Sequence, residues 1–121
     1  MKKTKVGVIG VGYLGRFHAH KYAAMDDVEL VGVADADPER AQLVAGECAC
    51  RAFADYRELL AQVDAVSIAV PTSLHHEVTK VCLQQRVDVM VEKPITTTLA
   101  EADDLIKLAR EQKCKIGRAH V

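Results

Sequence analysis

The sequence predicts an α/β domain in which helices cover both faces of a doubly wound parallel sheet. Two hydrophobic periods alternate along the 121 residues. Continuous runs rich in Val and Ile are typical of buried parallel strands, and runs with apolar residues three or four positions apart are typical of helices. The connections are short, and no Pro/Gly-rich linker interrupts the alternation. This order indicates parallel strands joined by right-handed helical crossovers.

The first half of the chain is expected to hold three strands and three helices. Its expected strands are residues 5–10, 29–35 and about 51–54, and its expected helices are residues 14–25, a segment from Pro38 through Cys48, and residues 55–60. The second helix has the clearest start, because Asp37 is a good N-cap and Pro38 fits the first helical position.

The second half repeats the pattern with two strands and two helices. The expected strands are residues 64–70 and 87–91, with a helix at residues 73–85 between them. Thr98 and Glu101 form a capping box, so the last helix is expected to begin there. Its expected apolar stripe comprises Leu99, Ala102, Leu105, Ile106 and Ala109.

Composition and charge exclude several function classes. Apolar residues make up 50% and charged residues 27%, and the net charge is −1, so no basic stripe is available for nucleic acid or an anionic membrane. No apolar run approaches the ~20 residues that a membrane span needs, and we expect a cytoplasmic protein. The four cysteines are expected as reduced thiols. His18 and His20 lie two positions apart on different helix faces, so no metal site is expected.

A glycine-rich turn follows the first expected strand and opens the first expected helix. Gly10, Gly12 and Gly15 have the spacing G-x-G-x-x-G. In that motif the first glycine permits the tight turn, the second lets the backbone approach a pyrophosphate, and the third allows close packing of helix and strand. We expect this turn, with Tyr13 and Leu14, to bind the phosphates of a dinucleotide. The alternative is a glycine-rich turn without a ligand.

An acid at the end of the second strand favours the dinucleotide interpretation. Asp35 lies about 20 residues beyond the turn, where a carboxylate binds the hydroxyls of the adenosine ribose. It would repel a 2′-phosphate, and the next residue, Ala36, offers no compensating charge. NAD is therefore favoured over NADP. Arg40 is the nearest candidate for a cofactor contact, and the alternative makes it a solvated helix residue.

Four segments together resemble a known family. GVIGVGYLGRFHAHKY, VGVADADPERA, VSIAVPTSLHHEV and VEKPITTTLAEADDL are similar to the N-terminal half of the Gfo/Idh/MocA oxidoreductases, and the resemblance extends to about Cys114. It implies a Rossmann domain that binds NAD(P), and a C-terminal, largely open β-sheet domain that this chain lacks. It also implies oxidation or reduction of a carbinol carbon on a sugar, cyclitol or sugar nucleotide, and a homo-oligomer formed through the missing domain.

The same resemblance assigns a role to the triplet Glu92-Lys93-Pro94, which ends the VDVMV strand. In the family this lysine hydrogen-bonds the reacting oxygen and supports proton transfer, which makes Lys93 the expected catalytic residue. Pro94 would fix the turn that aims Lys93, and Glu92 would oppose any lowering of the lysine pKa if its carboxylate lies close. The alternative is a polar strand end followed by a turn-forming proline.

The loop PTSLHH is the second expected contact with the nicotinamide end. The family pattern is Pro-Asn-x-x-His, which Pro71 and His75 match while Thr72 replaces the asparagine. Thr72 keeps a hydroxyl but loses the two-sided hydrogen bonding of an amide, which puts its contact in doubt. For His75 a structural hydrogen bond is the alternative to ligand contact, and His76 is expected to face solvent.

The resemblance also bears on the substrate and leaves two other functions open. The run VGYLGRFHAHKYA is most similar to members that oxidise the 3-hydroxyl of UDP-N-acetylglucosamine. The alternatives are a non-catalytic nucleotide-binding regulator of the same fold, and a Rossmann reductase acting on an amino-acid-type substrate.

The ending IGRAHV equals the translation of a common sequencing-adapter string that runs into a stop codon. We therefore expect the native domain to comprise residues 1–115 and residues 116–121 to be read-through. The alternative is that residues 116–121 belong to a sixth strand.

Overall fold

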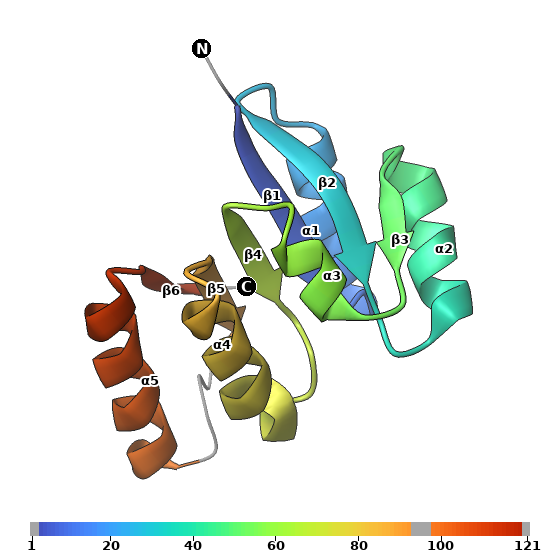
Figure 1. Ribbon diagram of the computed structural model, residues 1–121. Helices are drawn as coiled ribbons and strands as arrows, with labels where there is room; N and C mark the ends of the chain where they lie inside the picture. The colour runs from blue at the N-terminus through green and yellow to red at the C-terminus, as the bar shows by residue number, and fades with distance from the viewer. Residues whose placement is uncertain (1–2, 93–97, 120–121) are drawn as a thin grey trace.

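The computed structural model describes residues 3–92 and 98–119. They form one six-stranded parallel sheet in the order β3-β2-β1-β4-β5-β6 (Figure 1). The strands are β1 Thr4–Ile9, β2 Val28–Ala34, β3 Arg51–Phe53, β4 Ala65–Ile68, β5 Asp88–Glu92 and β6 Ile116–Ala119. The helices are α1 Tyr13–Ala23, α2 Pro38–Cys48, α3 Tyr56–Leu60, the 3₁₀ turn Thr72–Leu74, α4 His75–Gln84 and α5 Leu99–Gln112. The predicted doubly wound fold is confirmed.

Each face of the sheet has its own hydrophobic core. Neighbouring residues of a strand point to opposite faces, so in β1 Val8 belongs to one core and Ile9 to the other. Val8 packs with residues of α1 and α2, such as Ala19 and Val44. The core around Ile9 takes its helical residues from α3, α4 and α5. This two-sided burial explains why the strands are continuous apolar runs.

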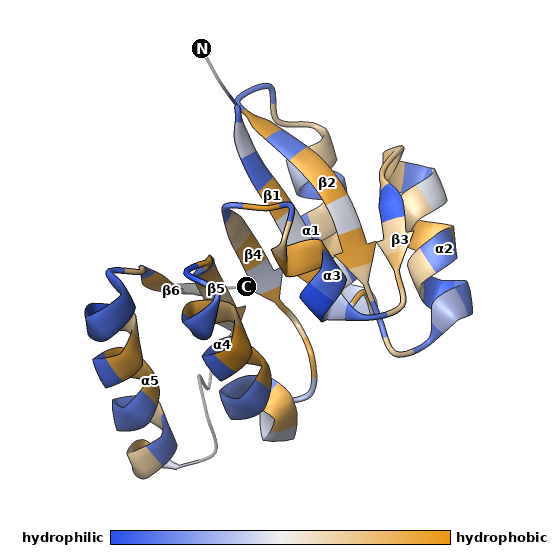
Figure 2. Cartoon of the chain, in the orientation of Figure 1, coloured by the Kyte–Doolittle hydropathy of each residue, from blue (hydrophilic) through white to orange (hydrophobic). Residues whose placement is uncertain are grey.

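The last helix is less buried than its sequence pattern predicts. Leu105 and Ala109 are buried, but Leu99 is 84% and Ile106 is 43% exposed. Figure 2 shows the apolar side of α5 turned toward α4 and its hydrophilic side turned outward. The five-residue stripe was therefore predicted too wide, because α5 lies at the end of the sheet and packs along one side.

A contact between α4 and α5 corrects another expectation. His76 does not simply face solvent: its Nε2 lies 2.9 Å from Oδ2 of Asp104, and its Nδ1 lies 3.6 Å from Oε2 of Glu101. The His76 contact holds the pKa of the Asp104 carboxyl below its ordinary value. His76 thus links the two helices. Sequence spacing gave no sign of this, because the partners lie more than twenty positions away.

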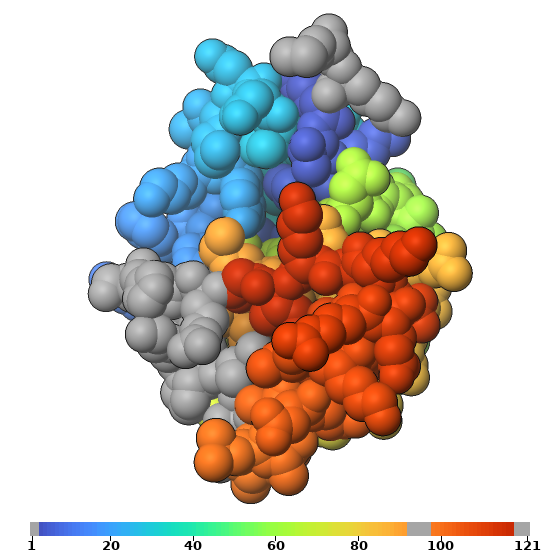
Figure 3. Space-filling model, turned by 90° about the vertical axis from the view of Figure 1, so that its left-hand side faces the viewer, coloured from blue at the N-terminus to red at the C-terminus, as the bar shows by residue number. Residues whose placement is uncertain are grey.

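The end of the chain forms a strand at the edge of the sheet. Residues Ile116–Ala119 pair in parallel with Val89–Glu92 of β5. Figure 3 shows the C-terminal part of the chain, coloured orange to red, gathered on this side of the molecule. This strand agrees with the alternative that residues 116–121 belong to a sixth strand. The origin of residues 116–121 in read-through stays a prediction.

Candidate functional site

The turn between β1 and α1 depends on glycine at two positions for reasons internal to the protein. Gly10 has φ +88°, and a Cβ there would stand 2.8 Å from the backbone carbonyl of Ala69. A Cβ on Gly15 would stand 1.6 Å from the carbonyl oxygen of Gly10. These two glycines let the first turn of α1 pack directly on the ends of β1 and β4. Packing within the protein therefore explains glycine at both positions, whether or not a ligand binds.

Gly12 differs from the other two glycines. Among the described residues, the atom nearest to a Cβ on Gly12 is Nη1 of Arg40, at 3.9 Å. No close packing contact within that part of the protein therefore demands glycine here. A ligand that approaches the backbone closely does demand it.

The start of α1 is suited to a phosphate group. In the described part of the chain, the N-cap residue Gly12 makes no side-chain hydrogen bond to the helix, and the first turn contains no acidic residue. The backbone N–H groups of the first turn, which starts at Tyr13 and includes Leu14, therefore remain available to bind an anion. The helix dipole adds positive potential there. The Tyr13 side chain is exposed and that of Leu14 is half-buried. Together with the lack of a side chain at Gly12, this arrangement fits a pyrophosphate.

Asp35 follows β2 and lies beside the glycine turn. Its Oδ2 accepts a hydrogen bond from the Val11 N–H at 2.8 Å, and its Oδ1 accepts one from the Asp37 N–H at 2.8 Å. A carboxylate has about four acceptor positions, and these two bonds leave about two of them. That is the number which the 2′- and 3′-hydroxyls of a ribose require. Asp35 thus fixes the turn and keeps acceptors for a sugar.

Arg40 lies closer to this acid than the sequence indicated. Its Nη1 is 3.8 Å from Oδ2 of Asp35, although half of its side chain is exposed. The helix cap explains its position: Asp37 accepts hydrogen bonds from the Glu39 and Arg40 N–H groups, which sets Arg40 in the first turn of α2. Arg40 is therefore a neighbour of Asp35, and its interpretation as a solvated helix residue is incomplete.

The loop after β4 lies next to the glycine turn. The Ala69 N–H donates to the Ile9 carbonyl at 2.8 Å, which joins the ends of β4 and β1. Between these two strands the order of the sheet reverses, and in open α/β sheets ligands bind at such a point. Pro71 is exposed and Thr72, which begins the 3₁₀ turn, is half-buried.

His75 has a structural contact in this loop. Its side chain is buried, and its Nε2 lies 2.8 Å from the carbonyl oxygen of Val70. This contact agrees with the alternative for His75, a structural hydrogen bond. A contact of Pro71, Thr72 or His75 with the cofactor stays a prediction.

The third strand end at this edge belongs to β5, which ends at Glu92. Because β1, β4 and β5 are parallel neighbours or near neighbours, their carboxyl ends lie at one edge of the sheet. The predicted catalytic residue Lys93 and the following Pro94 lie outside the described residues. Their roles, like any contact of the Glu92 side chain, stay predictions.

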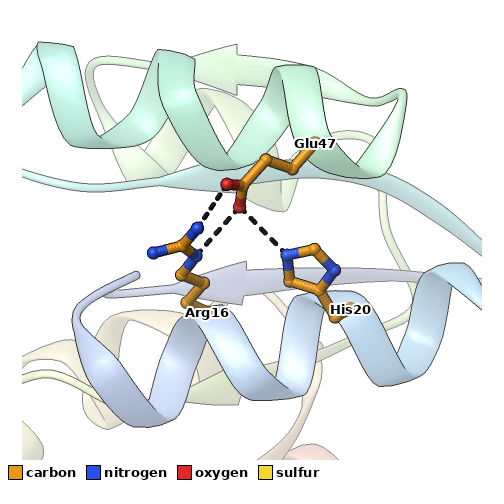
Figure 4. Close-up of polar contacts among 3 residues, drawn as sticks. All are labelled: Arg16, His20 and Glu47. Atoms are coloured by element: carbon orange, nitrogen blue, oxygen red, sulfur yellow. Dashed lines mark hydrogen bonds and ion pairs between the residues drawn. The ribbon is translucent and has the colours of Figure 1, made fainter.

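An ionic cluster behind the glycine turn escaped the sequence analysis. Glu47 of α2 accepts a hydrogen bond from Nε of Arg16 at 2.9 Å, pairs with the same guanidinium through its second oxygen, and lies 3.0 Å from Nε2 of His20 (Figure 4). Arg16 and, to a smaller extent, His20 lower the pKa of the Glu47 carboxyl. The cluster joins α1 to α2, the two helices that carry the glycine turn and Arg40. Glu47 lies 27 positions from His20 in the sequence, so the spacing gave no sign of this contact.

Other kinds of site find little support in the described residues. They contain no group of three or more His, Cys, Asp or Glu side chains that could hold a metal ion, and no helix among them has the length and apolar character to cross a bilayer. The cysteines are free thiols. Burial raises the pKa of Cys82 to about 12 and that of Cys50 to about 11, so these thiols stay protonated and unreactive at neutral pH.

A G-x-G-x-x-G turn at the start of α1, an acid beside it and a sheet whose order reverses between β1 and β4 are the features of a dinucleotide-binding Rossmann domain. Comparison with known proteins extends this class to a family. The model of the Gfo/Idh/MocA family, described as "Oxidoreductase family, NAD-binding Rossmann fold", matches residues 4–120. The chain belongs to this family.

Curated relatives include sugar-nucleotide and inositol dehydrogenases. The chain is 50% identical to the UDP-N-acetylglucosamine 3-dehydrogenase of Acidithiobacillus ferrooxidans over 121 residues, which are 100% of this chain and 38% of that protein. It is 31% identical to an inositol 2-dehydrogenase of Rhizobium meliloti over 93% of this chain and 34% of the relative. The chain thus spans little more than a third of the length of these relatives.

Solved structures agree with the fold. The Acidithiobacillus ferrooxidans UDP-N-acetylglucosamine 3-dehydrogenase GnnA superposes with a TM-score of 0.93 at 50% identity, covering 98% of this chain and 38% of that one. GenD2 from gentamicin A biosynthesis, solved in complex with NAD, superposes with a TM-score of 0.94 at 26% identity, covering 98% and 35%. The family resemblance and the NAD cofactor predicted from the sequence are confirmed.

Proposed function

We propose that this chain is the coenzyme-binding part of a dehydrogenase that moves a hydride between NAD and a carbinol carbon of a sugar, cyclitol or sugar nucleotide. UDP-N-acetylglucosamine is the first substrate candidate, because the relative that acts on it is 50% identical over the whole chain. The observation that carries the coenzyme assignment is the absence of any close contact at Gly12 among the described residues, at the start of α1 and beside Asp35.

Each described site residue has one task in this proposal. The N–H groups of the first turn of α1 bind the pyrophosphate, which reaches them because Gly12 has no side chain. The free acceptors of Asp35 bind the two hydroxyls of the adenosine ribose. Thr72 offers a hydroxyl near the nicotinamide ribose, on a loop that His75 holds through the Val70 carbonyl. When bound, NAD supplies the hydride acceptor.

Lys93 is the proposed acid–base residue. It follows β5 directly in the sequence, and the carboxyl ends of parallel strands carry the ligand sites in such sheets. Its ammonium group would donate a hydrogen bond to the reacting oxygen and support the transfer of the hydroxyl proton. This role comes from the family resemblance of the Glu-Lys-Pro triplet.

Two alternatives remain open beside the dehydrogenase. A non-catalytic regulator of the same fold needs the coenzyme pocket but has no use for an acid–base lysine, so the presence of Lys93 favours the enzyme. A reductase of amino-acid-type substrates has no reason for the Glu-Lys-Pro triplet. We further propose that the 121-residue chain binds NAD without turnover. Its cytoplasmic location and a homo-oligomeric state of the complete protein stay predictions.

Binding and catalysis can be tested separately. Isothermal titration of the 121-residue chain with NAD should show one site per chain, and addition of UDP-N-acetylglucosamine should produce no NADH. A chimera in which this chain replaces the matching part of the Acidithiobacillus ferrooxidans relative should reduce NAD with UDP-N-acetylglucosamine and not with myo-inositol.

Each outcome bears on a different part of the proposal. Failure of the 121-residue chain to bind NAD would contradict the coenzyme site. A chimera that folds and binds NAD but oxidises no sugar or cyclitol would favour the regulator. NADH formation by the chain alone would disprove only the claim that it lacks turnover.

A further inference from the structure

His76 joins the first turn of α4 to the beginning of α5. Its Nε2 lies 2.9 Å from Oδ2 of Asp104, which is the length of a hydrogen bond, and its Nδ1 lies 3.6 Å from Oε2 of Glu101. Each ring nitrogen thus faces a carboxylate of α5. The His76 side chain is only 27% exposed, so packing as well as these contacts restrains the ring.

Glu101 also takes part in the cap that defines where α5 begins. The N-cap residue Thr98 accepts a hydrogen bond from the Glu101 N–H at 3.1 Å, and its Oγ1 lies 3.4 Å from Oε1 of Glu101. One carboxylate oxygen therefore faces the cap and the other faces His76. The contact with His76 thus holds the capped start of α5 on α4.

The two adjacent histidines connect α4 to two different segments. His75 holds the loop after β4 through the Val70 carbonyl at 2.8 Å, and this loop contains Thr72, the proposed contact near the nicotinamide ribose. His76 holds the start of α5, and Thr98 lies five positions after Lys93 in the sequence. The first turn of α4 is therefore linked to both segments that the proposed reaction needs.

A different contact joins the same helices at their other ends. Nε of Arg86, which follows α4, donates a hydrogen bond to Oε1 of Gln112, the last residue of α5, at 3.3 Å. The two helices lie side by side (Figure 1), and both connect parallel strands, so their last turns lie away from the carboxyl ends of the strands. The chain thus offers one interhelical contact near the proposed site and one far from it.

We propose that His76 is a positioning residue for the reaction: it fixes the start of α5 on α4 and so sets the place of Lys93 relative to the loop that contains Thr72. This inference rests on the proposed function in one respect, the acid–base role of Lys93. Small displacements of a reacting group lower turnover strongly, so a residue that touches no substrate affects the rate in this way. The proposed NAD contacts lie at α1 and Asp35, so NAD affinity should not depend on His76.

The contact itself is tested in the 121-residue chain without substrate. Amide hydrogen exchange, followed by mass spectrometry, should be roughly three- to tenfold faster at residues 98–104 in His76→Ala, the size expected for the loss of one hydrogen bond. His76→Gln keeps an N–H donor for Asp104 and should restore most of the protection. Asp104→Ala removes the partner at a half-exposed position and should have the effect of His76→Ala with less risk to folding.

Turnover is tested in the chimera with the Acidithiobacillus ferrooxidans relative. His76→Ala and Asp104→Ala should each lower kcat by roughly tenfold and leave the NAD dissociation constant unchanged, and His76→Gln should retain most of kcat. Gln112→Ala is the matched control, because it removes the contact at the far ends of the same helices. It should speed exchange in the last turn of α5 and leave kcat unaltered.

The results separate this proposal from the proposed function. Equal losses of kcat in Asp104→Ala and Gln112→Ala would show a general effect of helix packing and overturn the role of His76. Full turnover in Asp104→Ala, or a loss in His76→Gln as large as that in His76→Ala, would overturn it as well. A wild-type chimera that folds and binds NAD without turnover would contradict the dehydrogenase itself, and the task of His76 with it.

Discussion

The polar side chains that follow the strands make different hydrogen bonds in the two halves of the sheet. In the half built from β1 and β2, the polar group at the strand end is tied to the turn it serves: Asp35 binds the Val11 N–H and still has acceptors to offer. In the half built from β4 and β5, two histidines make hydrogen bonds within the protein. His75 binds the Val70 carbonyl, and His76 binds α5 through Asp104.

Under the proposed function, this difference separates the residues that bind the coenzyme from the residue that carries the chemistry. In the first half, the proposed coenzyme site consists of local backbone and one acid, Asp35. In the second half, the described side chains position the loops, and the expected chemistry rests on Lys93 at the end of β5. We therefore expect changes in the first half to alter coenzyme binding and folding, and changes at Lys93 to alter turnover alone.

The largest effect should come from Lys93→Ala, measured in the chimera with the Acidithiobacillus ferrooxidans relative. Turnover should fall by roughly 10²–10⁴, the usual size of general acid–base assistance, while the NAD dissociation constant stays nearly unchanged. Steady-state assays and calorimetry measure the two quantities. Lys80→Ala, at an exposed position of α4, is the control. A loss of turnover below about threefold would make Lys93 a structural residue and remove the contrast between the halves.

Gly15→Ala should destabilise the first half most strongly. The new Cβ would lie 1.6 Å from the Gly10 carbonyl oxygen, so α1 must move away from β1. We expect the free energy of unfolding to fall by about 3 kcal/mol or more, measured by urea denaturation with circular dichroism.

The matched control is Gly46→Ala in α2, where a Cβ meets no described atom within 4 Å. That change should raise the free energy of unfolding by about 0.5–1 kcal/mol, because alanine favours a helix. Equal effects of the two substitutions would contradict the close packing of α1 on β1.

Asp35→Ala should change coenzyme choice by a smaller factor. The variant loses both ribose acceptors and the negative charge, so NAD should bind about tenfold more weakly and its advantage over NADP should narrow. Calorimetry with both coenzymes measures the change. Asp55→Ala, which removes an acid beyond β3 and outside the site, should leave both affinities unaltered. An undiminished preference for NAD in Asp35→Ala would show that another residue selects the coenzyme.

The smallest effect should come from the cluster on α1 and α2. Arg16 and His20 lower the pKa of Glu47, so the ionised form stabilises the folded state. That stabilisation is present above the ordinary pKa of a glutamate, about 4.3, and is lost as the pH falls through the lower folded value. Glu47→Gln should therefore lower Tm by less than about 2 °C at pH 7 and weaken the acid dependence of Tm. A Tm difference that persists unchanged at pH 2 would refute this origin.

The sequence by itself determined the features that depend on neighbours along the chain. Strand and helix periods gave the alternation of elements, the caps at Asp37 and Thr98 placed two helix starts, and the glycine spacing with Asp35 identified the dinucleotide turn. Each of these rests on a pattern within about 20 residues, whose local physics is the same in any fold.

Only the tertiary structure decided which side chains from different elements meet. The placing of Arg40 beside Asp35, the bond from His75 to Val70 and the joining of Arg16 to Glu47 depend on the angles and spacing at which elements pack. Patterns of neighbouring residues along the sequence do not determine those packing angles. The exposure of Leu99 has the same cause: apolar residues at helical spacing are buried only where a neighbouring element lies over them, and α5 has such neighbours along one side.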